Sequence, residues 1–240
     1  YENLELKQEI FKSLDTVTKD HAILASNTSG LDIDAIASST KRPGKVVGTH
    51  FFSPANIMRL LEVVRGKDSS DETMATVMSI GKRMGKAAVV SLNAPGFIGN
   101  RMLAGYTYQA NMLLLEGALP NQVDSALESF GMSMGPFRMM DLVGLDLGWR
   151  ARKLANIETP LANKISDALC EQDRFGQKTS KGFYNYSEGS RAPNPAPENE
   201  DIYKEISSQN NIERREISDQ EIIDRCILAL VNEGARILEE

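Results

Sequence analysis

The chain has 240 residues, 41% of them hydrophobic and 25% charged, with a formal net charge of −6 and a pI near 5.2. This is the composition of a globular protein with one or two domains, and its acidic balance argues against a nucleic-acid-binding domain, which needs a basic face. No apolar run approaches the ~20 residues that span a bilayer. The two cysteines, Cys170 and Cys226, have no second cysteine or histidine at metal-ligand spacing, so we expect no disulfide framework and no metal site.

Helical and strand patterns alternate through the first ~90 residues. This alternation predicts a parallel α/β sheet with helices on its faces. Ser69 with Glu72 three residues later forms the pattern of a capping box, which predicts the start of a helix. The expected helices cover 3–17, 32–39 and the segment after Ser69, and the expected strands cover 22–25, 45–52, 60–64 and 87–90.

Helical spacing dominates after the turn cluster Asn93-Ala94-Pro95-Gly96. We expect a helix over 97–116, a helix capped by Asn121, and further helices to about residue 172. A Pro-rich polar stretch follows, and Ser218 with Glu221 predicts the cap of a last helix. The fold class is therefore α/β followed by all-α. The expected divisions are an α/β domain over 1–93, a helical domain over 94–188, a linker over 189–216 and the start of a second helical domain over 217–240.

His50 stands at the end of the apolar run Val46–Thr49, and Glu62 lies inside a second apolar run. His50 taken alone fits either a core histidine or a general base, since an imidazole exchanges protons near neutral pH. A carboxylate among apolar neighbours is costly unless it is paired. Adjacent strands would bring the two side chains together, with Glu62 orienting the imidazole for proton transfer.

Ser29 follows the first expected strand, where doubly wound sheets bind their ligands. A helix cap and a ligand contact are both open for it. Asn100 lies early in an expected helix, and asparagine is a mediocre helix former, which suggests a cap or a specific hydrogen bond. No G-x-G-x-x-G follows a strand, so the 240 residues contain no dinucleotide phosphate loop.

Several motifs occur in the order in which 3-hydroxyacyl-CoA dehydrogenases carry them, and the resemblance spans roughly residues 1–186. The forms SNTSGLDID and MGPFRMMDLVGLD look most like the dehydrogenase part of the peroxisomal multifunctional enzymes of β-oxidation. The resemblance implies the C-terminal part of a Rossmann-type NAD-binding domain, followed by a helical domain like that of 6-phosphogluconate dehydrogenase. Its glycine-rich first βαβ unit would precede Tyr1, so we expect an internal piece of a longer protein. The motifs are SNTSGLDIDAIA, GTHFFSPA, LLEVV, PGFIGNRM, MGPFRMMDLVGLD and KTSKGFYNY.

The resemblance also implies residue roles and a reaction. His50 matches the family's catalytic histidine and Glu62 its partner. The resemblance also implies catalytic roles for Ser29 and Asn100, which match contacts to the 3-oxygen region of the substrate and, for Ser29, to the cofactor. The implied reaction is NAD-dependent oxidation of 3-hydroxyacyl-CoA to 3-oxoacyl-CoA, with His50 as the base. Further cofactor contacts are implied for Glu2, Lys7, Ser53 and Lys178, although many relatives carry Asn at the position of Ser53.

Two alternatives stay open at this stage: a dehydrogenase of another β-hydroxy acid, and a non-catalytic structural relative. The resemblance further implies an enoyl-CoA hydratase domain on the same parent chain and an acyl-CoA substrate, with a dimer also possible. We expect a peroxisomal location, with the mitochondrial matrix or the bacterial cytoplasm as alternatives.

Overall fold

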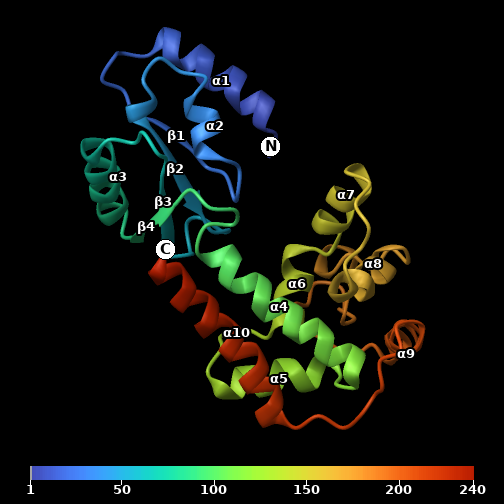
Figure 1. Ribbon diagram of the computed structural model, residues 1–240. Helices are drawn as coiled ribbons and strands as arrows, with labels where there is room; N and C mark the ends of the chain where they lie inside the picture. Colours follow the sequence, from blue (N-terminus) through green and yellow to red (C-terminus); the bar gives the residue numbers. More distant parts are fainter. Residues whose placement is uncertain (1) are drawn as a thin grey trace. The chain divides into compact units, whose positions relative to one another are not determined.

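The computed structural model describes residues 2–240, which form two compact units, residues 2–101 and 102–240 (Figure 1). The first unit is α/β and the second is helical, so the predicted order of fold classes is confirmed. Helix α4 (Gly99–Glu116) contributes residues to both units. Among the described residues, none of the helices is both long and apolar enough to cross a bilayer.

The first unit contains one sheet in the order β1 (Leu24–Ser26), β2 (Val46–Phe51), β3 (Leu60–Arg65) and β4 (Ala87–Leu92). The outer pairs are parallel, but β2 and β3 are antiparallel. The prediction of a wholly parallel sheet is therefore wrong at this pair. A parallel pair needs a crossover of about a dozen residues or more, usually a helix, and the connection 52–59 is too short to supply one.

Helices cover both faces of this sheet (Figure 1). Helices α1 (Leu4–Val17) and α2 (Ile33–Ala37) share one core cluster with β1, Val46 and Val64. Helix α3 (Asp71–Arg83) shares the other cluster with the alternate strand residues, such as Val47 and Val63. Because successive strand side chains point to opposite faces, His50 and Glu62 belong to the face that α1 and α2 cover.

The cap of α3 lies one residue later than the sequence predicts. The side chain of Ser70 accepts the N–H of Thr73 at 3.2 Å. The Ser69 hydroxyl is buried instead, where it donates to the carbonyl of Val46 at 2.6 Å and accepts the N–H of Gly66. Only Ser69 has a glutamate three residues later, so the capping-box pattern selects the wrong one of two adjacent serines.

The second unit is built around one large apolar core. Helix α5 begins at Pro120 with Leu119 at its N-cap, so the predicted cap at Asn121 is wrong by two residues. Proline is favoured at the first helical position because it lacks the N–H that would be unpaired there. The further helices are α6 (Pro136–Val143), α7 (Asp146–Leu154), α8 (Lys164–Cys170), α9 (Glu200–Gln209) and α10 (Asp219–Glu239). Short 3₁₀ turns occur at Pro43–Lys45 in the first unit and at Leu161–Asn163, Gln177–Thr179 and Pro197–Asn199 in the second.

Residues 189–216, which the sequence predicts as a linker, contain helix α9. Its Tyr203 and Ile206 are buried in the core of the second unit, so this part of the segment is packed structure. The Pro-rich composition describes only the residues before the helix. Helix α10 begins as predicted, because the Ser218 side chain accepts the N–H of Glu221.

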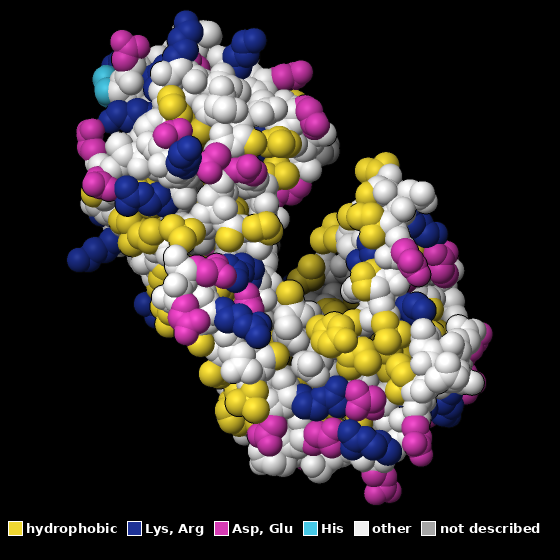
Figure 2. Space-filling model, viewed as in Figure 1, with side chains coloured by type: hydrophobic (Ala, Val, Ile, Leu, Met, Phe, Trp, Pro, Cys, Tyr) yellow, Lys and Arg dark blue, Asp and Glu magenta, His cyan; other side chains and the backbone are white. Residues whose placement is uncertain are grey.

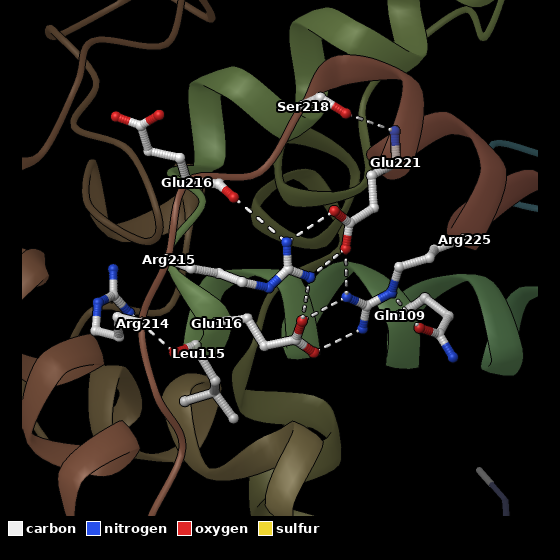
Figure 3. Close-up of polar contacts among 9 residues, drawn as sticks. All are labelled: Gln109, Leu115, Glu116, Arg214, Arg215, Glu216, Ser218, Glu221 and Arg225. Carbon is white, nitrogen blue, oxygen red and sulfur yellow. Dashed lines mark hydrogen bonds and ion pairs between the residues drawn. The ribbon is translucent and has the colours of Figure 1, made fainter.

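A network of ion pairs fastens α10 to the C-terminal end of α4. Figure 3 shows the guanidinium groups of Arg215 and Arg225 pointing at the carboxylates of Glu116 and Glu221. Arg225 binds Glu116 through two nitrogens, at 2.6 and 2.7 Å. The backbone at Arg215 passes so close to Gly117 that only glycine fits there, because a Cβ at position 117 would lie 2.1 Å from the carbonyl oxygen of Arg215.

Candidate active site

His50 and Glu62 face each other across the antiparallel pair of strands. The register places His50 of β2 directly opposite Glu62 of β3. The imidazole Nδ1 lies 2.5 Å from the Glu62 Oε2, and both side chains are buried, Glu62 completely. The sequence prediction that adjacent strands bring these two residues together is therefore confirmed.

The second oxygen of Glu62 is held by the backbone. Oε1 accepts the N–H of Ile98 at 3.0 Å and that of Gly99 at 2.7 Å. A buried carboxylate is costly unless its lone pairs are used, and these two bonds with the imidazole satisfy both oxygens. The two backbone N–H groups can only donate, and two donors on one oxygen favour the ionised carboxylate.

The partners of the imidazole fix its tautomer. A carboxylate only accepts hydrogen bonds, so Nδ1 of His50 carries the proton. Nε2 makes no hydrogen bond to the residues that the structure describes and is free to accept a proton from a substrate. The ring lies between Phe52 and Phe97, whose ring centroids are 4.4 and 5.8 Å from its own. Apolar neighbours of this kind keep water from the ring and restrict its orientation.

A second polar group gathers at the carboxyl end of β1. Glu2 accepts hydrogen bonds from the Ser29 amide at 2.5 Å, from the Ser29 hydroxyl at 2.8 Å and from the Thr28 hydroxyl at 2.8 Å. Burial raises the pKa of Glu2, but these bonds and the charge of Lys7 outweigh it, so the pKa lies below its ordinary value. Glu2 is therefore held as an anion beside the strand end.

Lys7 and Asn100 join the same strand end. The Lys7 ammonium donates to the Ser26 hydroxyl at 3.2 Å and to the Asn27 carbonyl at 3.3 Å. The Asn100 amide donates to the Ser29 carbonyl at 3.1 Å. Asn27 in turn accepts the N–H of Phe51, the residue after His50. Four of the predicted residues, Glu2, Lys7, Ser29 and Asn100, are thus linked at the end of β1.

Two other predicted residues stand apart from these contacts. Ser53 is exposed in the connection between β2 and β3. Lys178 belongs to the second unit, where it pairs with the buried carboxylate of Asp146, which also binds Arg150 at 3.2 Å. Their roles remain predictions.

Sequence reasoning missed the groups that hold Glu62. Ile98 and Gly99 act through backbone amides, which leave no mark on residue type. The sequence predicts Phe97 only as part of a helix, but its φ of 53° places it in a turn before α4, and its side chain is buried against His50. The sequence PGFIGN, with two glycines around an aromatic residue, was the available signal.

The second unit also holds two buried aspartates, each with three hydrogen-bond donors. Burial raises the pKa of both Asp124 and Asp141 to about 6, although these bonds act to lower it. Asp124 accepts the N–H groups of Phe137 and Arg138, and Asp141 those of Phe183 and Tyr184; the tyrosines donating hydroxyls are Tyr184 to Asp124 and Tyr186 to Asp141. These carboxylates brace loops and helices inside the unit.

The end of β1 fits part of a dinucleotide. Doubly wound sheets bind nucleotides at this edge, and Glu2, Lys7 and Ser29 supply both charge and hydrogen-bonding groups there. The glycine-rich phosphate loop is not among the 240 residues. The residues present therefore fit the part of the cofactor beside His50 and leave its phosphates to other groups. Among the described residues, no cluster of three or more His, Cys, Asp or Glu could hold a metal ion.

The fold and the paired residues define the class of protein: a Rossmann-like sheet that holds a buried His–Glu pair, followed by a helical domain. Sequence comparison gives the family. The 3-hydroxyacyl-CoA dehydrogenase NAD binding domain matches residues 1–94, and the C-terminal domain of the same enzymes matches residues 96–186. The chain belongs to the 3-hydroxyacyl-CoA dehydrogenase family, whose cofactor is NAD.

Individual relatives agree with this assignment. The chain is 49% identical to a peroxisomal bifunctional enzyme of Danio rerio and 38% identical to the fatty acid oxidation complex subunit alpha of a Psychrobacter species; each match covers the whole chain but only 36% and 34% of the relative. The chain thus spans about a third of the length of these curated relatives. Among solved structures, the dehydrogenase part of multifunctional enzyme 1 from C. elegans is similar, with a TM-score of 0.71, 33% identity, and coverage of 100% of this chain and 54% of that one.

Proposed function

We propose that this chain carries the proton-transfer site of an enzyme that oxidises 3-hydroxyacyl-CoA to 3-oxoacyl-CoA in fatty-acid β-oxidation. The single observation that supports this most strongly is the buried pair of His50 and Glu62, with the imidazole Nε2 left free. A histidine that serves only to pack a core has no need of a carboxylate held by two backbone amides. The relatives named above act in the same area of metabolism.

In this proposal His50 is the general base. Its Nε2 takes the proton of the substrate's 3-hydroxyl group, while NAD, when bound, accepts the hydride from C3. Glu62 stabilises the imidazolium that results, and it does so without moving because Ile98 and Gly99 already hold it. Preorganised partners of this kind need no rearrangement when charge develops.

The residues at the end of β1 have proposed roles in binding. Ser29 and Asn100 would orient the 3-oxygen of the substrate, and Ser29 would also contact NAD with Glu2 and Lys7. Ser53 and Lys178 are proposed as further cofactor contacts. For Lys178 this requires its ammonium to divide its bonds between Asp146 and the cofactor.

An apolar substrate suits the second unit. A cavity of about 260 Å³ there is lined on one part by apolar side chains, among them Leu103, Met139, Met140 and Val143, and on another by polar ones that include Asn111 and Arg152. Figure 2 shows that hydrophobic side chains also gather on the surface over α7, where Leu147 and Leu154 are among those exposed. Such surfaces suit an aliphatic acyl chain.

The setting of the enzyme is proposed from the same relatives. An enoyl-CoA hydratase domain on the parent chain would account for the much greater length of the bifunctional relative. We propose a peroxisomal location on the name of that relative, and a bacterial location is the alternative because of the Psychrobacter protein. A dimer is also proposed, to be tested by sedimentation.

The test is NADH oxidation with acetoacetyl-CoA, run on the 240-residue chain alone and on the chain joined to an upstream βαβ unit with a glycine-rich loop. The proposal expects activity in the joined form and much less in the chain alone, because the phosphates of the cofactor need that loop. If both forms are folded and neither is active, this substrate is wrong. Activity with free acetoacetate equal to that with its CoA ester would point instead to another β-hydroxy acid.

A further inference from the structure

The turn before helix α4 has an unusual backbone. Gly96 has φ of 78° and Phe97 has φ of 53°, in the left-handed region that residues with a side chain rarely adopt. This conformation is disfavoured for an L-residue, because its Cβ comes too close to the following carbonyl oxygen. Phe97 is nevertheless almost fully buried beside His50, so the packing around the imidazole offsets the cost.

This turn aims two successive amides at one oxygen. The N–H groups of Ile98 and Gly99 both reach Oε1 of Glu62, at 3.0 and 2.7 Å. Successive N–H groups in such turns form a concave site for anions. In this turn the anion is the side chain that orients the imidazole, so the turn acts on His50 through Glu62.

The absence of a side chain on Gly99 also affects the surroundings of His50. A Cβ on Gly99 would lie 2.7 Å from Cζ and 3.2 Å from Cε1 of Phe52, closer than atoms can approach without movement. The Phe52 ring lies against the imidazole of His50, with the centroids 4.4 Å apart. Any side chain at position 99 therefore pushes on a ring that contacts His50.

We infer that Gly99 is a positioning residue for the His50–Glu62 pair: its amide holds the carboxylate, and its lack of a side chain leaves room for the ring against the imidazole. The effect on turnover rests on the proposed function. The effect on the pair itself does not, because the hydrogen bond between Nδ1 and Glu62 exists without substrate or cofactor.

The hydrogen bond can be followed directly by NMR. The chain has only two histidines, and His21 is exposed, so protein labelled with ¹⁵N in histidine gives two ring systems that His21→Gln assigns. A proton in a bond as short as 2.5 Å is strongly deshielded. We expect a far-downfield Nδ1–H resonance for His50 that is absent in Glu62→Gln.

Two double variants separate the amide of Gly99 from its size. Phe52→Leu removes the ring atoms that a Cβ would meet, and Gly99→Ala and Gly99→Pro then add similar atoms, but only proline lacks the N–H. Proline is tolerated at the first position of a helix, where Gly99 stands. We expect the downfield resonance to persist in Phe52→Leu/Gly99→Ala and to shift or vanish in Phe52→Leu/Gly99→Pro.

Turnover should follow the same order. In the chain joined to the upstream βαβ unit, which we call the active form, the single variant Gly99→Ala should lower kcat at least tenfold and leave KM nearly unchanged. The Phe52→Leu/Gly99→Ala variant should recover part of the loss, and its proline counterpart should not. If the proline variant fails to fold, replacing Gly99 with glycolic acid exchanges the N–H for an oxygen and adds no side chain.

Two results would overturn the inference. One is an Nδ1–H resonance in the proline or glycolic-acid variant at the wild-type position. The other is a kcat within threefold of wild type for Gly99→Ala. If the wild-type protein itself shows no turnover with acetoacetyl-CoA, the proposed function fails, and the NMR comparison still decides the role of Gly99.

Discussion

Replacing Glu62 with glutamine tests the pair with almost no change of shape. Glutamine has one acceptor oxygen and one NH₂ group. If the oxygen stays with the amides of Ile98 and Gly99, the NH₂ group faces Nδ1 of His50 and forces the proton onto Nε2. The atom that should accept the substrate's proton is then already protonated. If the glutamine is reversed, its NH₂ group meets two amide donors instead.

The size of the loss follows from the bonds involved. A hydrogen bond to a charged group contributes about 1.5–3 kcal/mol. Each ~1.4 kcal/mol is a factor of ten in rate. Losing the charged bond to the imidazole should therefore lower kcat about 10- to 150-fold, and more if the wrong tautomer dominates.

The assay is single-turnover reduction of NAD by 3-hydroxybutyryl-CoA, the direction in which Nε2 accepts the proton, in the chain joined to the upstream βαβ unit, with NADH affinity measured separately by fluorescence. We expect the rate to fall and the affinity for NADH to stay within about twofold, since Glu62 is fully buried and touches no exposed group. Glu62→Asp is the matched control, because it keeps the charge but shortens the reach. A loss in Glu62→Gln below fivefold, or a loss that appears only in NADH affinity, would contradict a role for Glu62 in proton transfer.

Stability in the second unit should depend on its buried aspartates and on the ion pairs of α10. Because burial raises the folded-state pKa of Asp124 and Asp141 to about 6, above the ordinary 3.8, their contribution is full below pH ~4 and is lost as the pH rises through ~6. The free energy of unfolding, followed by the single tryptophan, should fall by roughly 1–3 kcal/mol per group between pH 4 and 7, and a rise would contradict this. Arg225→Leu should cost about 1–2 kcal/mol by removing its two hydrogen bonds to Glu116, which would keep only Arg215, whereas Lys204→Leu, at an exposed pair, should cost under ~0.5 kcal/mol; equal losses would show that the network in Figure 3 adds little.

The sequence was sufficient for the elements whose side chains face a core. The runs at 45–52 and 60–64 predicted β2 and β3, and helical spacing predicted the change to an all-α domain. The two runs alone do not give the direction of the strands, which depends on the connection between them. The available signal was the length of that connection, because residues 52–59 are too few for the helical crossover that a parallel pair needs. The antiparallel pairing is what sets His50 opposite Glu62.

Boundaries were harder to predict than elements. The capping-box pattern favours Ser69, but the hydroxyl of Ser69 binds the carbonyl of Val46 in β2, which leaves Ser70 to cap α3. The Pro-rich composition of 189–216 predicted a linker, although Tyr203 and Ile206 lie at helical spacing inside that segment. In both places the deciding factor is tertiary contact rather than local propensity.

The candidate site divides in a similar way. His50 and Glu62 could be predicted because a buried histidine and a buried carboxylate each need a partner. The amides of Ile98 and Gly99 could not, because every residue except proline offers the same group. The direction in which these two amides point is set by the backbone of the turn at Phe97, where φ is positive.

Proton transfer by His50 is tested most directly by the single-turnover rate of His50→Gln against wild type, measured with acetoacetyl-CoA and saturating NADH in the active form. General acid–base catalysis by a positioned side chain contributes about 10²–10⁴-fold, and we expect a loss in that range with NADH affinity unchanged. A loss of less than tenfold would remove His50 from proton transfer, and with it the proposed role of Glu62 as the group that stabilises the imidazolium.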